Sequence, residues 1–318
     1  MSIILNNSML ELFPKTYFYK NGNYCVEFDG ETKIYRAFRR NEELISDFPD
    51  SIDLKVSGRC RIGCPWCHES STMEGKIFDY NKTINILSQL PEYPIEIAIG
   101  GGDVLENPEE ITELIGWLNN KKYKPRLTVN IKSLTQNITV EQETLLKLVS
   151  TIGISINSYK ELDNFFKNIL QGSIKNIILD KRLVFHVIAG LFPPEDMESV
   201  LKIGGKLLIL GYKQFGRAEG TKIPDLSPTI SVIPELLKRP IGTIGFDNLA
   251  IEQLGIKGMI DKKTWESYFM GEEGSHSMYI DAVEGKFART SRSRERVSWD
   301  EVGLIEYFKS LRNDNTSY

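Results

Sequence analysis

From residue 52 onward, short and nearly continuous apolar runs alternate with longer segments whose apolar residues recur at helical spacing. Such alternation predicts strands joined by helical crossovers, which together build a parallel sheet. Continuously apolar strands indicate that both faces of the sheet are covered. The absence of an obvious linker favours one barrel-like α/β domain, with a doubly wound open sheet as the alternative. The predicted strands occupy residues 52–57, 95–103, 126–132, 152–157, 182–190, 206–212 and 241–247.

Residues suited to cap a helix precede three of the predicted helices. They are Asn107 followed by Pro108, and two capping boxes, Thr139 with Gln142 and Ser158 with Glu161. Helical spacing also predicts helices over residues 79–90 and 194–203.

Two flanking regions have the period-two alternation of antiparallel strands. Residues 16–39 alternate around Asn21-Gly22 and Asp29-Gly30, which supply the positive φ angles of tight hairpin turns. Residues 277–296 predict another hairpin with Glu284-Gly285 at its turn, and an amphipathic helix follows at 304–313. The chain therefore divides into an N-terminal β-meander (1–50), a barrel (51–256) and a C-terminal extension (257–318).

The bulk composition is that of an ordinary globular protein. Hydrophobic residues make up 41% and charged residues 26% of the 318 residues, and the net charge is −4. This charge argues against general nucleic-acid binding by the whole surface. No signal-peptide pattern opens the sequence, and the longest apolar run (183–192) is about half of a membrane span. We expect a cytoplasmic protein with no membrane partner.

Three of the four cysteines, Cys60, Cys64 and Cys67, lie within eight residues, whereas Cys25 stands apart as a small buried hydrophobe. In a reducing compartment such clustering indicates metal or redox chemistry. Cys64 to His68 reads as a c-type haem attachment site, but this leaves Cys60 without a role. A zinc site could use the three cysteines and His68, although adjacent residues rarely wrap one tetrahedral ion. A third interpretation is an iron–sulfur cluster held by three thiolates, which leaves one iron open for a substrate or cofactor.

The segment CRIGCPWC, residues 60–67, resembles the CxxxCxΦC motif of the radical S-adenosylmethionine (SAM) enzymes, with Trp66 at the aromatic position. The Gly-Gly-Glu motif of that family corresponds to Gly101-Gly102-Asp103 here, after the second predicted barrel strand. The resemblance implies a partial (β/α)6 barrel and a [4Fe–4S] cluster on the three cysteines. It further implies that a flavodoxin- or ferredoxin-type donor reduces the cluster. SAM would then be cleaved to a 5′-deoxyadenosyl radical that abstracts hydrogen from a substrate.

The resemblance also assigns candidate SAM contacts. Trp66 would pack near the adenine, and Gly101 and Gly102 would let backbone carbonyls approach the methionine ammonium while Asp103 fixes the turn. Strand ends supply the remaining candidates, which are Asn130, Ser155 and, in a partial match to an adenine-binding segment, Ile188. His186, flanked by apolar residues, is expected to be a satisfied core histidine.

Basic residues suggest where a substrate could bind. Lys213, Gln214 and Arg217 follow the sixth predicted strand, and the segment 286–296 carries five cations, including Arg292 and Arg294, against Glu295. These groups favour an anionic, nucleotide-like substrate. The segment 277–296 instead resembles the start of the C-terminal extension of peptide-modifying radical SAM enzymes, without its cysteines. A peptide or protein maturase is therefore the alternative, and a non-catalytic zinc- or cluster-binding protein is an alternative of another class.

Overall fold

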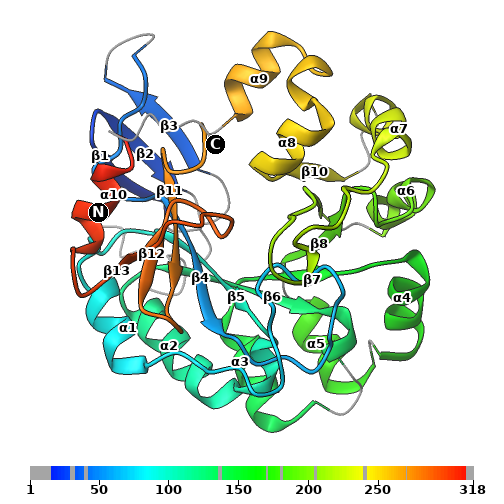
Figure 1. Cartoon of the computed structure of the whole chain (residues 1–318), viewed down its shortest axis with the longest axis horizontal. Helices are drawn as coiled ribbons and strands as arrows, with labels where there is room; N and C mark the ends of the chain where they lie inside the picture. The colour runs from blue at the N-terminus through cyan, green and yellow to red at the C-terminus, as the bar shows by residue number, and fades with distance from the viewer. Residues whose placement is uncertain are drawn as a thin grey trace, which may run out of the picture.

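The structure is a computed structural model in which residues 16–28, 33–38, 42–134, 138–169, 171–179, 182–203, 206–238, 242–269 and 271–312 are described. Its helices and strands follow one another around a strongly curved sheet (Figure 1). No helix in these ranges is both long and apolar enough to cross a lipid bilayer.

Seven parallel strands are hydrogen-bonded in their order along the chain, from β4 to β10. A doubly wound sheet would reverse its strand order at a switch point, so this order selects the barrel-like alternative. The strands are β4 (Ser51–Ser57), β5 (Glu96–Gly101), β6 (Lys124–Asn130), β7 (Thr151–Ser155), β8 (Arg182–Ile188), β9 (Lys206–Leu210) and β10 (Thr243–Phe246). The predicted partial barrel is confirmed.

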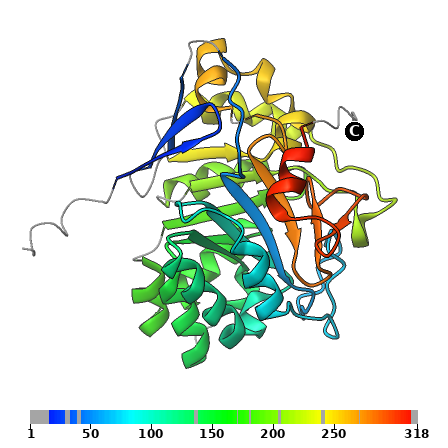
Figure 2. The same ribbon diagram turned by 90° about the vertical axis from the view of Figure 1, so that its left-hand side faces the viewer.

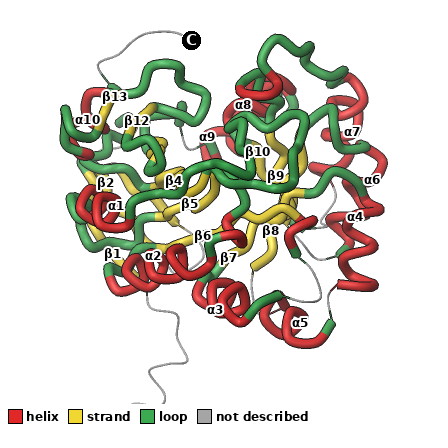
Figure 3. Tube along the Cα trace, turned by 60° about the horizontal axis from the view of Figure 1, so that its bottom comes forward, coloured by secondary structure: helices red, strands yellow, loops and turns green. Residues whose placement is uncertain are grey.

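Helices α1 to α7 lie around the outside of the strands (Figure 3). They are α1 (Tyr80–Leu87), α2 (Pro108–Asn120), α3 (Val140–Leu148), α4 (Tyr159–Asn164), α5 (Gly172–Leu179), α6 (Pro194–Lys202) and α7 (Ser227–Lys238). The predicted capping box of α3 is present, since Thr139 and Gln142 each bond the other's backbone N–H. Asn107 occupies the N-cap position of α2 but makes no side-chain capping bond there.

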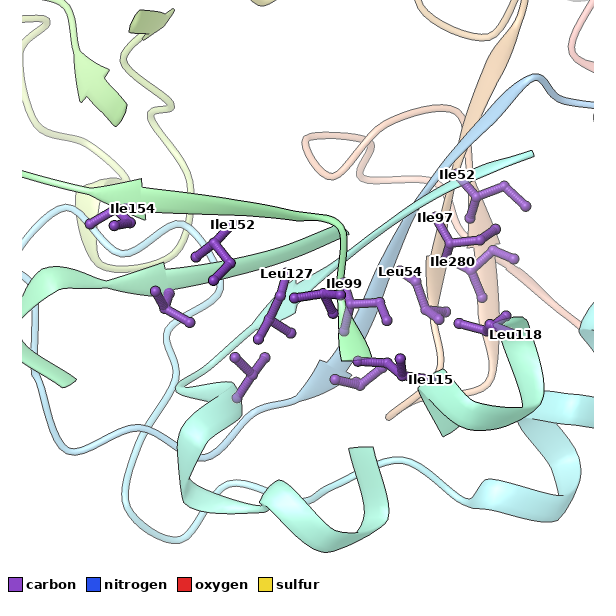
Figure 4. Close-up of a cluster of buried hydrophobic side chains, with 14 of the residues drawn as sticks. Ile52, Leu54, Ile97, Ile99, Ile115, Leu118, Leu127, Ile152, Ile154 and Ile280 are labelled. Carbon is purple, nitrogen blue, oxygen red and sulfur yellow. The ribbon is translucent and has the colours of Figure 1, made fainter. Parts of the chain in front are cut away.

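The core between the sheet and these helices is aliphatic. Figure 4 shows Ile52 and Leu54 of β4 beside Ile97 and Ile99 of β5, with α2 beneath them. Because side chains alternate along a strand, the residues between them in β4, Asp53 and Lys55, lie on the opposite, concave face of the sheet. The concave face is therefore the polar one.

The N-terminal meander consists of β1 (Tyr17–Asn21), β2 (Tyr24–Phe28) and β3 (Lys33–Ala37), paired antiparallel. This confirms the predicted meander, and the first turn carries Gly22 at φ 62°. The second predicted turn, Asp29-Gly30, lies outside the described residues. Tyr24 donates a hydrogen bond to the Asp50 carboxylate just before β4, which ties the meander to the barrel.

The C-terminal segment joins the main sheet (Figure 2). After α8 (Asn248–Leu254) and α9 (Lys262–Tyr268), β11 (Ser277–Asp281) pairs parallel with β4 on the side away from β5. The antiparallel strands β12 (Lys286–Ala288) and β13 (Val297–Ser298) extend the sheet, and α10 (Leu304–Ser310) follows. The predicted hairpin is confirmed, with Gly285 at φ 68° in its turn. Its attachment to the edge of β4 was not evident from the sequence.

Candidate functional site

The cysteine loop, residues 58–79, leaves the carboxyl end of β4 and is closed on itself by backbone hydrogen bonds. The Cys60 N–H donates to the Thr72 carbonyl at 2.8 Å, and the Thr72 N–H donates to the Gly58 carbonyl at 3.0 Å. Inside the loop the Cys67 N–H donates to the Cys64 carbonyl at 3.2 Å. The three cysteines of this loop are half-buried free thiols.

The glycine turn after β5 packs directly on this loop. The Gly102 N–H donates to the Ser57 carbonyl at 2.6 Å, and the Asp103 N–H donates to the Arg59 carbonyl at 2.7 Å. A Cβ atom on Gly102 would lie 2.0 Å from the Arg59 oxygen, and one on Gly101, at φ 117°, would lie 2.4 Å from the Ser57 oxygen. The two predicted motifs thus form one unit, in which glycine is required for close backbone approach.

Asp103 has two hydrogen-bond partners in this unit. Its Oδ1 accepts from the Leu105 N–H at 3.1 Å, which caps the following short helical turn, and its Oδ2 accepts from the Ser133 hydroxyl at 2.6 Å. The carboxylate therefore fastens the glycine turn to the segment after β6.

A second segment, between β9 and α7, holds the cysteine loop from another side. Arg217 donates from Nη1 to the Cys64 carbonyl at 2.9 Å and from Nη2 to the Ser71 carbonyl, and its N–H donates to the Cys67 carbonyl at 3.0 Å. Gly216, at φ 60°, lies so close that a Cβ would be 2.5 Å from the His68 oxygen. Arg217, predicted as a candidate for substrate binding, is thus hydrogen-bonded to the backbone of the cysteine loop.

The candidate strand-end residues lie in one row across the barrel. Asn130, Ser155 and His186 are register partners on β6, β7 and β8, and Ile188 ends β8 two residues further on. The Asn130 amide lies 4.0 Å from the Cys64 sulfur, and its Oδ1 accepts from the Lys132 N–H. The row therefore extends from the cysteine loop across the concave face.

His186 does not fit the expectation of a satisfied core histidine. Its ring packs over Gly153, where an added Cβ would lie 2.5 Å from the imidazole, and neither ring nitrogen forms a hydrogen bond with a described residue. The cause lies on the neighbouring strand, because the missing side chain of Gly153 leaves room for the ring inside the barrel. Burial lowers the pKa of His186 from 6.5 to about 4.

This lowered pKa predicts an acid-sensitive contribution to stability. Above pH 6.5 the histidine is neutral in both states, but as the pH falls toward 4 the unfolded chain binds a proton that the folded chain excludes. The folded state then loses about 3 kcal/mol by pH 4. We expect His186→Gln to flatten urea-derived stability between pH 6.5 and 4. If the free energy of unfolding of His186→Gln depended on pH as that of the wild type does, His186 would not be the source of the acid sensitivity.

In residue type, the cysteine loop offers the three thiols that an iron–sulfur cluster with one open iron would use. Burial raises the pKa of the Cys60 thiol, while hydrogen bonds from the Ile62 and Gly63 N–H groups act in the opposite direction. Backbone N–H groups directed at sulfur are typical of cluster-binding loops. Gly63, at φ 70°, has open space where a Cβ would stand, and Trp66 lies half-buried between Cys64 and Cys67. The described residues contain no group of three or more histidine, cysteine or acidic side chains arranged around a single metal ion.

The remaining substrate candidates already have hydrogen-bond or ion-pair partners, most of which come from distant segments. Arg292 pairs with Glu273 at 2.5 Å, and the exposed Arg294 pairs with Glu219 at 3.2 Å. Exposed Gln214 donates to the Thr221 carbonyl. Lys213 donates to the Ser291 hydroxyl at 2.8 Å and has no carboxylate within ion-pair distance among the described residues. The positive charge of the segment 286–296 is therefore partly balanced by acids outside it.

A buried charge network next to the cysteine loop was not predicted. Lys55 of β4 lies between Glu69 in the loop and Asp281 of β11. Burial lowers the pKa of Lys55, but the two carboxylates raise it by a larger amount, so the net shift of the pKa is upward. The period-two alternation of β4 is enough to place Lys55 on the concave face of the sheet. Its partners could not be predicted from a local pattern, because Glu69 and Asp281 lie 14 and 226 residues away in the sequence.

The chain shares its fold with two solved proteins, SuiB and anSMEcpe. Streptococcus suis SuiB bound to its precursor peptide SuiA superposes with a TM-score of 0.60 at 14% identity, over 86% of this chain and 68% of SuiB. SuiB bound to SAM gives a TM-score of 0.58 over 83% and 66% of the two chains, also at 14% identity.

Native anSMEcpe with bound SAM gives a TM-score of 0.51 at 12% identity, over 83% of this chain and 81% of that one. This chain spans about two thirds of the length of SuiB. No protein-family model and no curated protein sequence matches it. At these identities the likeness to the solved structures is one of fold.

Proposed function

We propose that this chain is a radical SAM enzyme that holds a [4Fe–4S] cluster on Cys60, Cys64 and Cys67. The observation that carries the proposal is the packing of Gly102 and Asp103 on the backbone of the cysteine loop, at the carboxyl edge of the barrel. Reactive sites of parallel barrels form at this edge. The likeness of fold to SAM-bound SuiB and anSMEcpe supports the same assignment.

SAM would bind beside the cysteine loop, and each surrounding residue has a stated task. The backbone of Gly101 and Gly102 would face the methionine ammonium, while Asp103 keeps the turn rigid through its bond to Ser133. Trp66 offers a flat apolar surface for the adenine. The residues proposed to line the rest of the SAM site are Asn130, Ser155 and Ile188. When bound, the reduced cluster would supply the electron that cleaves SAM to the 5′-deoxyadenosyl radical.

Anaerobic reconstitution with iron and sulfide tests this function against a non-catalytic metal-binding protein. We expect a brown protein that releases 5′-deoxyadenosine from SAM after reduction with dithionite. A colourless protein that retains one zinc ion and leaves SAM intact would overturn the proposal. In the cell the electron would come from a flavodoxin or ferredoxin, and we propose a cytoplasmic location.

For the substrate we propose an anionic, nucleotide-like molecule that binds at Lys213. Lys213 is half-buried and its ammonium donates to the neutral Ser291 hydroxyl. The nearby Asp53 and Glu273 carboxylates interact with its charge but form no ion pair with it among the described residues, so an anion can bind there. We expect inorganic pyrophosphate to raise the melting temperature of the wild type through preferential binding to the folded state. Lys213→Met should lose this shift. Arg294→Ala is the control, because Arg294 is exposed and already paired with Glu219. No shift in the wild type would remove the support for an anionic substrate.

A peptide or protein substrate is the alternative, and it has its own support. The structure of SuiB that resembles this chain over 86% of its length contains a precursor peptide. The pairing of Arg292 and Arg294 with glutamates also lowers the charge that the segment 286–296 could offer an anion. A short precursor peptide encoded beside this protein would favour the alternative.

A further inference from the structure

A set of buried charges joins the cysteine loop to the C-terminal hairpin. The Lys55 ammonium lies 2.8 Å from Glu69 Oε2 and 3.1 Å from Asp281 Oδ2. The side chains of Lys55, Glu69 and Asp281 are only 11%, 7% and 1% exposed. The strand β4, the cysteine loop that follows it and the distant strand β11 therefore meet at one ammonium group.

The strand register explains why the lysine and the aspartate meet. Lys55 and Asp281 are direct partners in the parallel pairing of β4 with β11, and both lie on the concave face. The other oxygen of Asp281, Oδ1, accepts from the Val283 and Glu284 N–H groups, which begin the hairpin turn. Asp281 thus fixes the turn and the lysine together.

Three further side chains belong to the network, and one of them, His68, places its Nε2 3.4 Å from Glu69 Oε1. Arg296 donates from Nη1 to Asp281 Oδ2 at 2.8 Å, and its guanidinium lies 5.1 Å above the Tyr279 ring. The Tyr279 hydroxyl donates to Glu69 Oε1 at 2.9 Å. Two cations, Lys55 and Arg296, balance the carboxylates of Glu69 and Asp281. Removing one charge from such a buried, balanced set leaves another uncompensated.

Glu69 occupies a position from which it controls the end of the cysteine loop. It follows Cys67 by two residues, and the next residue, Ser70, donates its N–H to the Cys67 carbonyl at 3.2 Å. Holding the Glu69 carboxylate against β4 and β11 therefore restricts the backbone that carries the third thiol. Arg217, in the segment between β9 and α7, restrains the same loop through its hydrogen bond to the Cys64 carbonyl.

We propose that Glu69 is a positioning residue for the cluster site, held directly by Lys55 and Tyr279 and, through Lys55, by Asp281, so that the C-terminal hairpin sets the geometry of the three thiols. This inference rests on the proposed function insofar as the loop binds a cluster. The hairpin contributes no cysteine, and this network is its direct connection to Glu69.

Lys55→Met tests the proposal, because methionine fills the space of the lysine stem and leaves Glu69 without its cation. We expect iron release from the reconstituted protein to a chelator to become about tenfold faster, as for other residues that orient metal ligands. The reduced protein should also show a changed electron paramagnetic resonance line shape. Glu219→Gln, in the exposed pair with Arg294, is the matched control and should change neither readout.

The double variant Lys55→Met, Glu69→Gln separates charge balance from positioning. It leaves Asp281 paired with Arg296 and restores a neutral network, so the folded apo-protein should recover the melting temperature that Lys55→Met loses. Iron release should stay fast, because the loop has still lost its tether to β4. Recovery of slow iron release in the double variant would overturn the positioning role.

Thiol alkylation of the apo-protein distinguishes failure of this inference from failure of the proposed function. In Lys55→Met we expect Cys67 to react with iodoacetamide several-fold faster than in the wild type, whereas Cys25, in β2, reacts at an unchanged rate. If the wild type binds no iron but Cys67 is still alkylated faster in Lys55→Met than in the wild type, the positioning role of Glu69 is kept and the cluster is rejected. A wild type that binds the cluster, with alkylation and iron release both unchanged in Lys55→Met, would reject the tether and keep the cluster.

Discussion

Cys64→Ala is expected to abolish cluster binding and SAM cleavage together. Cys64 is the middle of the three thiols, it lies 4.0 Å from the Asn130 amide, and its carbonyl anchors both the Cys67 N–H and Arg217. The two remaining thiolates leave two irons of a [4Fe–4S] cluster without a protein ligand, instead of one. Iron and sulfide content after anaerobic reconstitution, and 5′-deoxyadenosine formed from SAM, measure the loss.

Cys25→Ala is the matched control for this variant. Cys25 lies in β2 of the meander, where it pairs with Lys20 and Arg36 of the flanking strands, in a different sheet from β4 and its cysteine loop. We expect it to keep wild-type iron content and SAM cleavage. SAM cleavage that survives in Cys64→Ala would show that the ligand assignment is wrong.

Gly102→Ala should remove the cluster while all three cysteines stay in place. The new Cβ would lie 2.0 Å from the Arg59 carbonyl oxygen, which is backbone and cannot swing aside. The cysteine loop must then move off the glycine turn, which breaks the bonds from Gly102 to Ser57 and from Asp103 to Arg59. We expect a destabilisation of about 3 kcal/mol and loss of most reconstituted iron. Urea unfolding and iron analysis measure the two effects.

Gly100→Ala provides the control within the same run of glycines. A Cβ at Gly100 would meet nothing within 4 Å, and its φ is not in the left-handed region. This variant should therefore fold and bind the cluster like the wild type. Equal iron content in Gly100→Ala and Gly102→Ala would contradict the view that close packing of the glycine turn shapes the site.

Local patterns in the sequence determined much of the architecture. The apolar runs located all seven parallel strands, although several end earlier than predicted; the run 126–132, for example, leaves the sheet after Asn130, which caps a short helical turn. The Thr139 capping box and the Glu284-Gly285 turn were readable for the same reason, since their partners are a few residues apart. The cysteine motif could be recognised for the same reason, because its three cysteines lie within one loop.

Other features depend on which strand edges and loops meet in space. The pattern of β11 predicted a hairpin strand but carried no information that its partner is β4, more than 200 residues earlier. Local charge counting around Arg292 and Arg294 could not include Glu273 and Glu219, which the fold brings to them.

The packing of the His186 ring over Gly153, which has no side chain, likewise depends on the pairing of two neighbouring strands, β7 and β8. The sequence by itself therefore determined the cysteine loop, the glycine turn and the succession of strands and helices. Only the tertiary structure decided which charges are balanced and what holds the loop, because those contacts join residues whose spacing along the chain follows no period.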